Sequence, residues 1–199
     1  MLGAKNTGSG ALLCGSVLKI HPRLTTERLR LRPFVAEDAE SLAALAGSPE
    51  IADTMLDWPH PFSIANARAT IAAQAALYQA GRAIHLAIER RDRAGLIGGI
   101  ELHALDNPHR CAELRFWIAE PDWGQGFASE AARAVLRFGF RELKLHRIDA
   151  LHLVRSAAAG AVLVKNGLRQ EGVLRERVQK AGRFEDVALC AVLAHEVEG

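Results

Sequence analysis

The sequence predicts an α/β fold in which about seven strands form a mixed, mostly antiparallel sheet flanked by about four helices. Segments in which polar and apolar residues alternate, typical of half-buried strands, interchange with segments whose apolar residues recur at helical spacing. A strand-like run, a glycine-bearing turn and a helical run follow one another between residues 111 and 143. These two observations favour one sheet that is covered by helices.

The first half of the chain contains three strands and two helices by this reasoning. We expect strands over 28–34, 83–89 and 96–104, and helices over 36–46 and 63–80. Ser63 is a suitable N-cap for the second helix, and Gly81 ends it. Gly98 and Gly99, inside a strand, indicate a bulge or a close approach of two backbones.

The second half of the chain again alternates strands with helices, and it ends in a β-hairpin. We expect strands over 111–119 and 147–153, helices over 129–143 and 156–166, and paired strands over 168–178 and 184–193. Ser156 is placed to cap the shorter helix, and Gly167 closes it.

Length and composition predict one domain. The chain has 199 residues, of which 49% are hydrophobic, enough for a core. Residues 1–22 are rich in Gly, Ser, Asn and Thr, so we expect a flexible N-terminal arm followed by a single domain over 23–199.

Charge and cysteine content exclude several kinds of partner. The formal net charge is +2, which gives no reason to expect nucleic acid or a membrane surface as a partner. No run of 18 apolar residues occurs. Cys14, Cys111 and Cys190 form no CxxC pair and no Cys/His cluster with zinc spacing, so we expect reduced thiols, a cytoplasmic protein and no metal.

The turn at Pro121–Ala132 is the stretch with the clearest chemistry. Its glycines, Gly124 and Gly126, let the backbone approach a ligand closely. The free N–H groups at the start of the following helix point toward the same place, together with the positive end of the helix dipole. The pattern predicts an anion site that suits a diphosphate.

The run Trp123–Ala131 resembles the acetyl-CoA-binding motif of the GNAT N-acetyltransferases, particularly the RimJ/RimL-type enzymes that acetylate ribosomal-protein N-termini. Other matching pieces occur in the expected order, namely Leu24–Phe34, Glu113–Ile118, Leu145–Asp149, Lys165–Leu168, and Glu171–Glu176 with Gly182–Asp186. The resemblance spans roughly residues 24 to 195. It implies a sheet whose strands splay apart at the cofactor.

The resemblance implies acetyl-CoA as co-substrate. Its pyrophosphate would accept hydrogen bonds from the turn, and its pantetheine arm would pair with the backbone of the preceding strand. The implied cofactor-binding residues are Trp117, Ile118, Ala119, Gly124, Gln125, Gly126, Ala128, Ser129 and Ser156. The sequence departs from the family pattern in places: Trp123 stands where Gln or Arg is usual, Ser156 and Ala159 replace the usual Asn and Ser, and Leu168 replaces the Phe.

Acetyl transfer to an amine requires a base, an oxyanion site and departure of the thiolate. We assign Glu113 as base, with Glu101 as second choice, and a backbone N–H near Ile118 for the oxyanion. The alternative for each carboxylate is an ion pair with an arginine on the sheet surface. The sole tyrosine, Tyr78, lies on another helix, so the acid is Ser156, a water or no residue at all, with His152 as a less favoured alternative.

The acceptor side is the least determined. Trp58 and His60 are candidate substrate contacts, although Trp58 also suits a core position. A protein N-terminal amine is the favoured acceptor because, at a pKa of about 8, roughly a tenth of it is neutral at pH 7. The alternatives are a small amine, such as a polyamine, amino acid or antibiotic, and a non-catalytic acyl-CoA-binding module. Exposed strand edges also leave room for a homodimer.

Overall fold

The computed structural model describes residues 21–58 and 60–197. The expected N-terminal arm, 1–22, therefore lies outside the described residues except for its last two positions.

One eight-stranded sheet, in the order β1-β2-β3-β4-β5-β6-β8-β7, organises the part of the chain that is described. The strands are β1 (Leu24–Thr25), β2 (Leu29–Arg32), β3 (Ile84–Arg90), β4 (Leu96–Asp106), β5 (Cys111–Ile118), β6 (Arg147–Leu153), β7 (Arg169–Lys180) and β8 (Arg183–Leu193). All neighbours are antiparallel except β5 and β6. The predicted mixed, mostly antiparallel sheet is confirmed.

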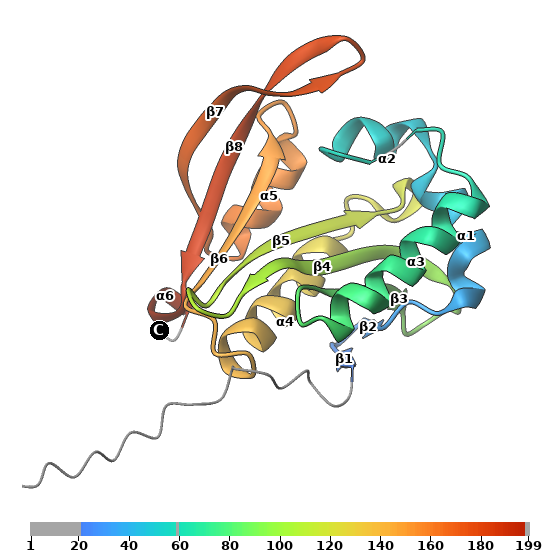
Figure 1. Ribbon diagram of the computed structural model, residues 1–199, viewed down its shortest axis with the longest axis horizontal. Helices are drawn as coiled ribbons and strands as arrows, with labels where there is room; N and C mark the ends of the chain where they lie inside the picture. The colour runs from blue at the N-terminus through green and yellow to red at the C-terminus, as the bar shows by residue number, and fades with distance from the viewer. Residues whose placement is uncertain (1–20, 59, 198–199) are drawn as a thin grey trace, which may run out of the picture.

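Helices cover both faces of this sheet (Figure 1). They are α1 (Ala39–Ala46), α2 (Pro49–Thr54), α3 (Ile64–Gln79), α4 (Phe127–Arg141), α5 (Ala157–Lys165) and α6 (Ala194–Val197). The larger core lies between the sheet and α4 with α5, and a second core lies between the sheet and α1 with α3. Across residues 21–58 and 60–197, no helix is long and apolar enough to cross a bilayer.

The elements that the sequence did not predict are short. They are β1 with two residues, α2 with six and α6 with four. Segments of this length hold too few residues to show a period. A further difference is that α4 begins at Phe127, two residues before the predicted start, because Gly126 takes the N-cap position.

The close approach predicted at Gly98 and Gly99 is present. A Cβ atom on Gly98 would lie 2.3 Å from the carbonyl oxygen of Trp117, and one on Gly99 would lie 2.7 Å from the indole Nε1 of Trp117. A bulge is also present: Ile88 pairs with Gly98 and Glu89 with Leu96, so the extra residue is Ile97 of β4, next to Gly98. The two glycines therefore let β5 and its tryptophan lie against β4.

β5 and β6 pair over only three residues, and this short ladder determines where a ligand can enter. The pairs are Cys111 with Arg147, Ala112 with Ile148, and Glu113 with Asp149. Both strands continue beyond the last pair, β5 to Ile118 and β6 to Leu153, without a ladder between them. The sheet is therefore split at its middle, as the resemblance implied.

An ion-pair network joins β2 and β3 to the start of α1. Arg32 donates to both carboxylate oxygens of Asp38, at 2.7 and 2.8 Å, and to Glu89 at 2.6 Å. Burial alone would raise the pKa of Asp38, but hydrogen bonds from Arg32 and from the Val35 N–H outweigh it, so the pKa lies below its usual value. Folding therefore favours the ionised carboxylate.

We expect Asp38→Ala to destabilise the protein by about 3 kcal/mol, because it leaves the Arg32 guanidinium with part of its charge uncompensated. Urea denaturation at pH 7 measures this loss. The depressed pKa means that the stabilisation is complete above the unfolded pKa of about 3.9 and disappears as pH falls through the lower folded value. Asp92→Ala, at an exposed pair with Arg90, is the control and should change little. Equal losses of stability in the two variants would contradict the stabilising role of the Asp38 carboxylate.

Candidate functional site

The turn between β5 and α4 presents backbone donors to solvent. Gly124 and Gly126 both have left-handed backbones, with φ of 72° and 80°. Gly126 is the N-cap of α4, and the first intrahelical bond runs from the Glu130 N–H to the Gly126 carbonyl. The N–H groups of Phe127, Ala128 and Ser129 therefore have no intrahelical acceptor and form the positive end of a 15-residue helix. A helix start of this geometry is suited to an anion.

Arg28, which precedes β2, holds this turn in place through a hydrogen bond and an ion pair. The sequence analysis did not predict this role for Arg28. Arg28 donates through Nε to Glu130 at 2.6 Å and through Nη1 to the Gln125 carbonyl at 3.0 Å. The guanidinium lies 4.6 Å from the centre of the Phe127 ring. Burial would raise the pKa of Glu130, but hydrogen bonds from Thr26 and Arg28 hold it below its usual value. The carboxylate is thus kept ionised as an anchor.

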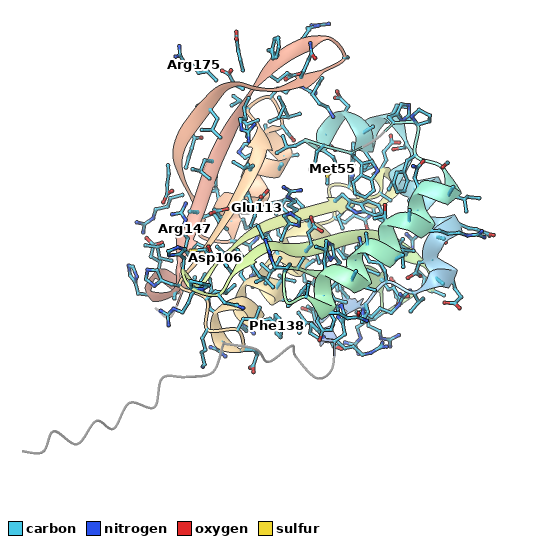
Figure 2. All side chains as sticks on the ribbon, viewed as in Figure 1. Met55, Asp106, Glu113, Phe138, Arg147 and Arg175 are labelled. Atoms are coloured by element: carbon cyan, nitrogen blue, oxygen red, sulfur yellow. The ribbon has the colours of Figure 1, made fainter. Side chains whose placement is uncertain are left out.

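A cleft of about 420 Å³ opens where β5 and β6 separate. One wall is the turn and the first residues of α4, and the opposite wall is α5 with the end of β6. The strand β5 and the end of α2 complete it; Figure 2 labels one residue of each, Glu113 and Met55. The anion site and a carboxylate therefore share one cavity.

Most of the residues predicted to bind the cofactor line this cleft. They are Trp117, Ile118, Gly124, Gly126, Ala128, Ser129 and Ser156. Gln125 and Ala119 do not line it. The carbonyl of Gln125 is turned to Arg28, and the N–H of Ala119 is donated to the Ile97 carbonyl at 2.8 Å. The Ala119 N–H is therefore used within the sheet, while the Gln125 N–H that was expected to bind the pyrophosphate stays a prediction.

The hydrogen bond from the Ala119 N–H to the Ile97 carbonyl shows which residues of β5 pair with β4. Along an antiparallel ladder every second residue directs its N–H and C=O groups to the partner strand. The backbone groups of Trp117 therefore face β4, and those of Ile118 face the gap beside β6. The Ile118 carbonyl accepts a hydrogen bond from the Trp123 indole at 2.5 Å. Trp123, the departure noted in the motif, therefore closes the end of β5, and the Ile118 N–H faces the cleft.

Ser156 is the N-cap of α5 but makes no capping bond. Within residues 21–58 and 60–197 its hydroxyl has no hydrogen-bond partner, and the residue lines the cleft. The expected capping role is therefore wrong, and the hydroxyl remains available to a ligand.

Glu113 lies on β5 at the point where the sheet splits. Its carboxylate accepts hydrogen bonds from Arg115 at 2.7 and 3.2 Å, so the arginine pairing considered as its alternative role is present. Asp149 is its partner across the β5–β6 ladder. Burial raises the pKa of Asp149; Arg147 opposes this shift, and the charge of Glu113 adds to it. Asp149 is a titratable neighbour that sequence reasoning missed.

The second candidate base, Glu101, does not line the cleft. Its Oε2 atom lies 2.5 Å from the Nε2 atom of His85, and its Oε1 atom lies 4.0 Å from the Nε atom of Arg115. The two candidate carboxylates therefore lie on either side of Arg115, and only Glu113 reaches the cavity.

The two residues predicted to contact the acceptor are also outside the cleft. Trp58 packs in the second core, with ring centres 4.9 Å from Phe62 and 6.3 Å from Trp117. His60 is exposed. Ile51 and Thr54 of α2 and residues 55–57, which follow the helix, line the cavity instead.

Two cations tie the end of α2 to the opposite side of the cleft. Lys180, at the tip of the β7–β8 hairpin, donates to the Ala52 and Met55 carbonyls, each at 2.6 Å. Arg155 makes two bonds of 2.7 Å with the Asp53 carboxylate and pairs with Glu185 at 2.8 Å. Figure 1 shows this hairpin extending beyond the rest of the sheet beside α2. These contacts join the two sides of the cleft near α2.

A second, basic groove begins at the turn and continues along the outer face of α4. It has a volume of about 920 Å³ and shares Gly126, Ser129 and Lys165 with the cleft. Arg133 and Arg137, one helical turn apart, face it and have no ion-pair partner in the described part of the chain. Their spacing of four residues was the available sequence signal.

The sequence of this chain is similar to those of known acetyltransferases. The model of the acetyltransferase (GNAT) domain matches residues 28–169. The Bacillus subtilis uncharacterized N-acetyltransferase YoaA is 38% identical over 172 residues, which cover 86% of this chain and 97% of that protein. The Escherichia coli ribosomal-protein-serine acetyltransferase is 28% identical over 137 residues, covering 68% of this chain and 75% of that protein.

Two further proteins are similar to this chain: one named for a polyamine substrate, and one whose structure is solved. The Vibrio cholerae spermidine N(1)-acetyltransferase is 33% identical over 115 residues, covering 55% of this chain and 66% of that protein. Mycobacterium smegmatis RimJ, solved with CoA-disulfide, has the same fold with a TM-score of 0.79 at 24% identity, over 86% of this chain and 84% of that one. The chain belongs to the GNAT family of N-acetyltransferases.

Proposed function

We propose that this protein transfers an acetyl group from acetyl-CoA directly to a primary amine, in a complex that holds both substrates. One observation carries the proposal: a single cleft joins the anion-binding turn to the Glu113 carboxylate. An anionic cofactor and an amine can therefore meet there.

The cofactor would lie across the turn and the gap in the sheet. Its pyrophosphate would accept hydrogen bonds from the N–H groups of the turn, and its pantetheine arm would lie beside the Ile118 backbone. The basic groove of Arg133 and Arg137 begins at the same turn and suits the phosphorylated nucleotide end. Relatives solved with coenzyme A, such as the M. smegmatis protein, support this choice of ligand.

The chemistry can be written onto the residues of the cleft. Glu113 would take the proton of the amine, directly or through a water, and the amine would attack the acetyl carbonyl. The Ile118 N–H is the donor for the resulting oxyanion. The thiolate would then leave and take a proton from the Ser156 hydroxyl or from water, since a thiol with a pKa of about 8.5 needs little assistance.

We propose a protein N-terminal α-amine as the acceptor. The carboxylates around the acceptor side that could attract a polyamine are already paired: Asp53 with Arg155, and Asp57 and Glu113 with Arg115. A polyamine would have to displace these guanidinium groups. An α-amine, about a tenth neutral at pH 7, also needs only one weak base. The relative named for ribosomal-protein serine supports this class.

A small amine is the second candidate because one relative is named as a spermidine acetyltransferase. A third reading is a module that binds acyl-CoA without turnover.

We propose that the protein is located in the cytoplasm, which agrees with the free thiols of Cys111 and Cys190.

Gly126→Glu should abolish acetyl-CoA binding, because it places a carboxylate at the N-cap where the pyrophosphate would lie. Isothermal titration calorimetry measures the affinity, and we expect at least a 100-fold loss. Gly182→Glu is the matched control: its φ is 79° against 80° at Gly126, so the backbone strain is alike, but it lies in the β7–β8 turn. Equal binding by both variants would contradict the placement of the cofactor.

Glu113→Gln should lower kcat by on the order of 100-fold with little change in the Kd of acetyl-CoA, because the base is lost while the anion site is kept. Glu171→Gln removes another strand carboxylate paired with an arginine, Arg147, outside the cleft, and should retain activity. Full activity of Glu113→Gln at every pH would show that another group is the base.

A peptide with a free N-terminal amine should be acetylated with at least tenfold higher kcat/KM than spermidine at pH 7.5. The same peptide with a blocked N-terminus and a free lysine should react poorly, since well under a thousandth of a lysine amine is neutral at pH 7. Better turnover of spermidine would favour the second candidate. Tight acetyl-CoA binding without turnover of any amine would favour the non-catalytic module.

A further inference from the structure

Two histidines and a glutamate form a cluster on the α3 side of the sheet, outside the cleft. Glu101 and His103 are two residues apart on β4 and so point to the same face. His85 is the direct cross-strand partner of Glu101 on β3. One ring nitrogen from each histidine and one carboxylate oxygen lie within 4.8 Å of one another.

The acetyl transfer described above gives the histidines of this cluster no role. His85 is 6% exposed, and its Nδ1 atom is buried without a hydrogen-bond partner among the described protein atoms. The Nδ1 atom of His103 is likewise buried and without a partner. A buried polar atom that lacks a partner costs free energy, so two such atoms in one cluster indicate a missing water or ion.

The donor set identifies the kind of ion. Two imidazoles and one carboxylate are ligands for Zn²⁺ and related transition metals, whereas Mg²⁺ and Ca²⁺ take mainly oxygen. Zinc bonds of about 2.1 Å in a tetrahedron place ligand atoms roughly 3.4 Å apart. The Nε2 atom of His85 now lies 2.5 Å from the Oε2 atom of Glu101, and the three ligand atoms all lie within 4.8 Å of one another. Side-chain rotations that part this close pair and draw the wider ones together would achieve the tetrahedral spacing, leaving a fourth position for water.

The surrounding charges favour a dication. Around the Arg115 guanidinium lie three carboxylates, Glu101, Glu113 and Asp57, within 4.0 Å. Their combined charge exceeds that of the arginine by two negative units. Arg115 faces the Oε1 atom of Glu101, and His85 faces Oε2, so a metal bound between the histidines and Oε2 leaves the arginine in place.

We propose that His85, Glu101 and His103 form a binding site for a divalent transition metal of the zinc type. None of the three residues lines the acetyl-CoA cleft, although His103 is the cross-strand partner of Glu113 on β5. It replaces the expectation of no metal, which considered only spacing along the chain. Bound metal would hold β3 and β4 together and engage the Oε2 atom of Glu101, the residue beside the Arg115–Glu113 pair.

Titration of untagged, metal-free protein with Co²⁺ and Zn²⁺ tests the site. We expect the visible absorption of four-coordinate Co²⁺ at one ion per chain, its displacement by Zn²⁺, and a rise in Tm of about 5 °C with Zn²⁺ in 100-fold excess over its Kd. Mg²⁺ should produce no shift. Absence of both the Co²⁺ spectrum and the Tm rise in the parent protein would overturn the proposal.

Variants locate the ion. His103→Gln and Glu101→Gln should each weaken Zn²⁺ binding by at least tenfold, while the control His109→Gln, on the exposed β4–β5 turn, should bind like the parent. Circular dichroism and acetyl-CoA titration confirm that each variant is folded. Unchanged Zn²⁺ affinity in both cluster variants would place the ion elsewhere and refute the assignment.

Discussion

The separation of β5 from β6 is the constraint on which the rest of the site depends. Three residue pairs join the strands, and the ladder ends at Glu113 and Asp149. Backbone N–H and C=O groups beyond that point require other partners. The Trp123 indole supplies one for the Ile118 carbonyl, while the Ile118 N–H is left facing the cleft. The same split thus creates the cavity, exposes a donor and brings Glu113 to the cavity wall.

Fixing the anion-binding turn requires residues distant in sequence. Gly124 and Gly126 give the turn its backbone shape, but that shape is held by Arg28, which contacts both Glu130 and the Gln125 carbonyl. Donors fixed before a ligand arrives need no reordering when it binds, so they bind it more tightly. The first strands of the domain are thereby coupled to the cofactor site.

The carboxylates named on the acceptor side are each paired with an arginine, although Arg115 is shared among Asp57, Glu101 and Glu113. Arg155 and Lys180 link α2 to the β7–β8 hairpin, and Arg115 holds Glu113 against the sheet. These contacts position the carboxylates and at the same time reduce their attraction for a polycation. The side of Arg115 away from the cleft is different, because there the cluster of His85, Glu101 and His103 contains buried nitrogens without partners.

The sequence by itself determined the order of the longer strands and helices, the glycine turn and its likeness to the GNAT motif, because periodicity and turn chemistry act over neighbouring residues. It did not predict α2, which has only six residues. Only the tertiary structure decided that Trp58 belongs to the core, that Glu101 turns away from the cleft toward His85, and that Arg28 supports the turn. Such contacts join residues far apart in the chain, and they depend on how the strands, helices and connecting segments pack against one another, which the order of neighbouring residues does not specify.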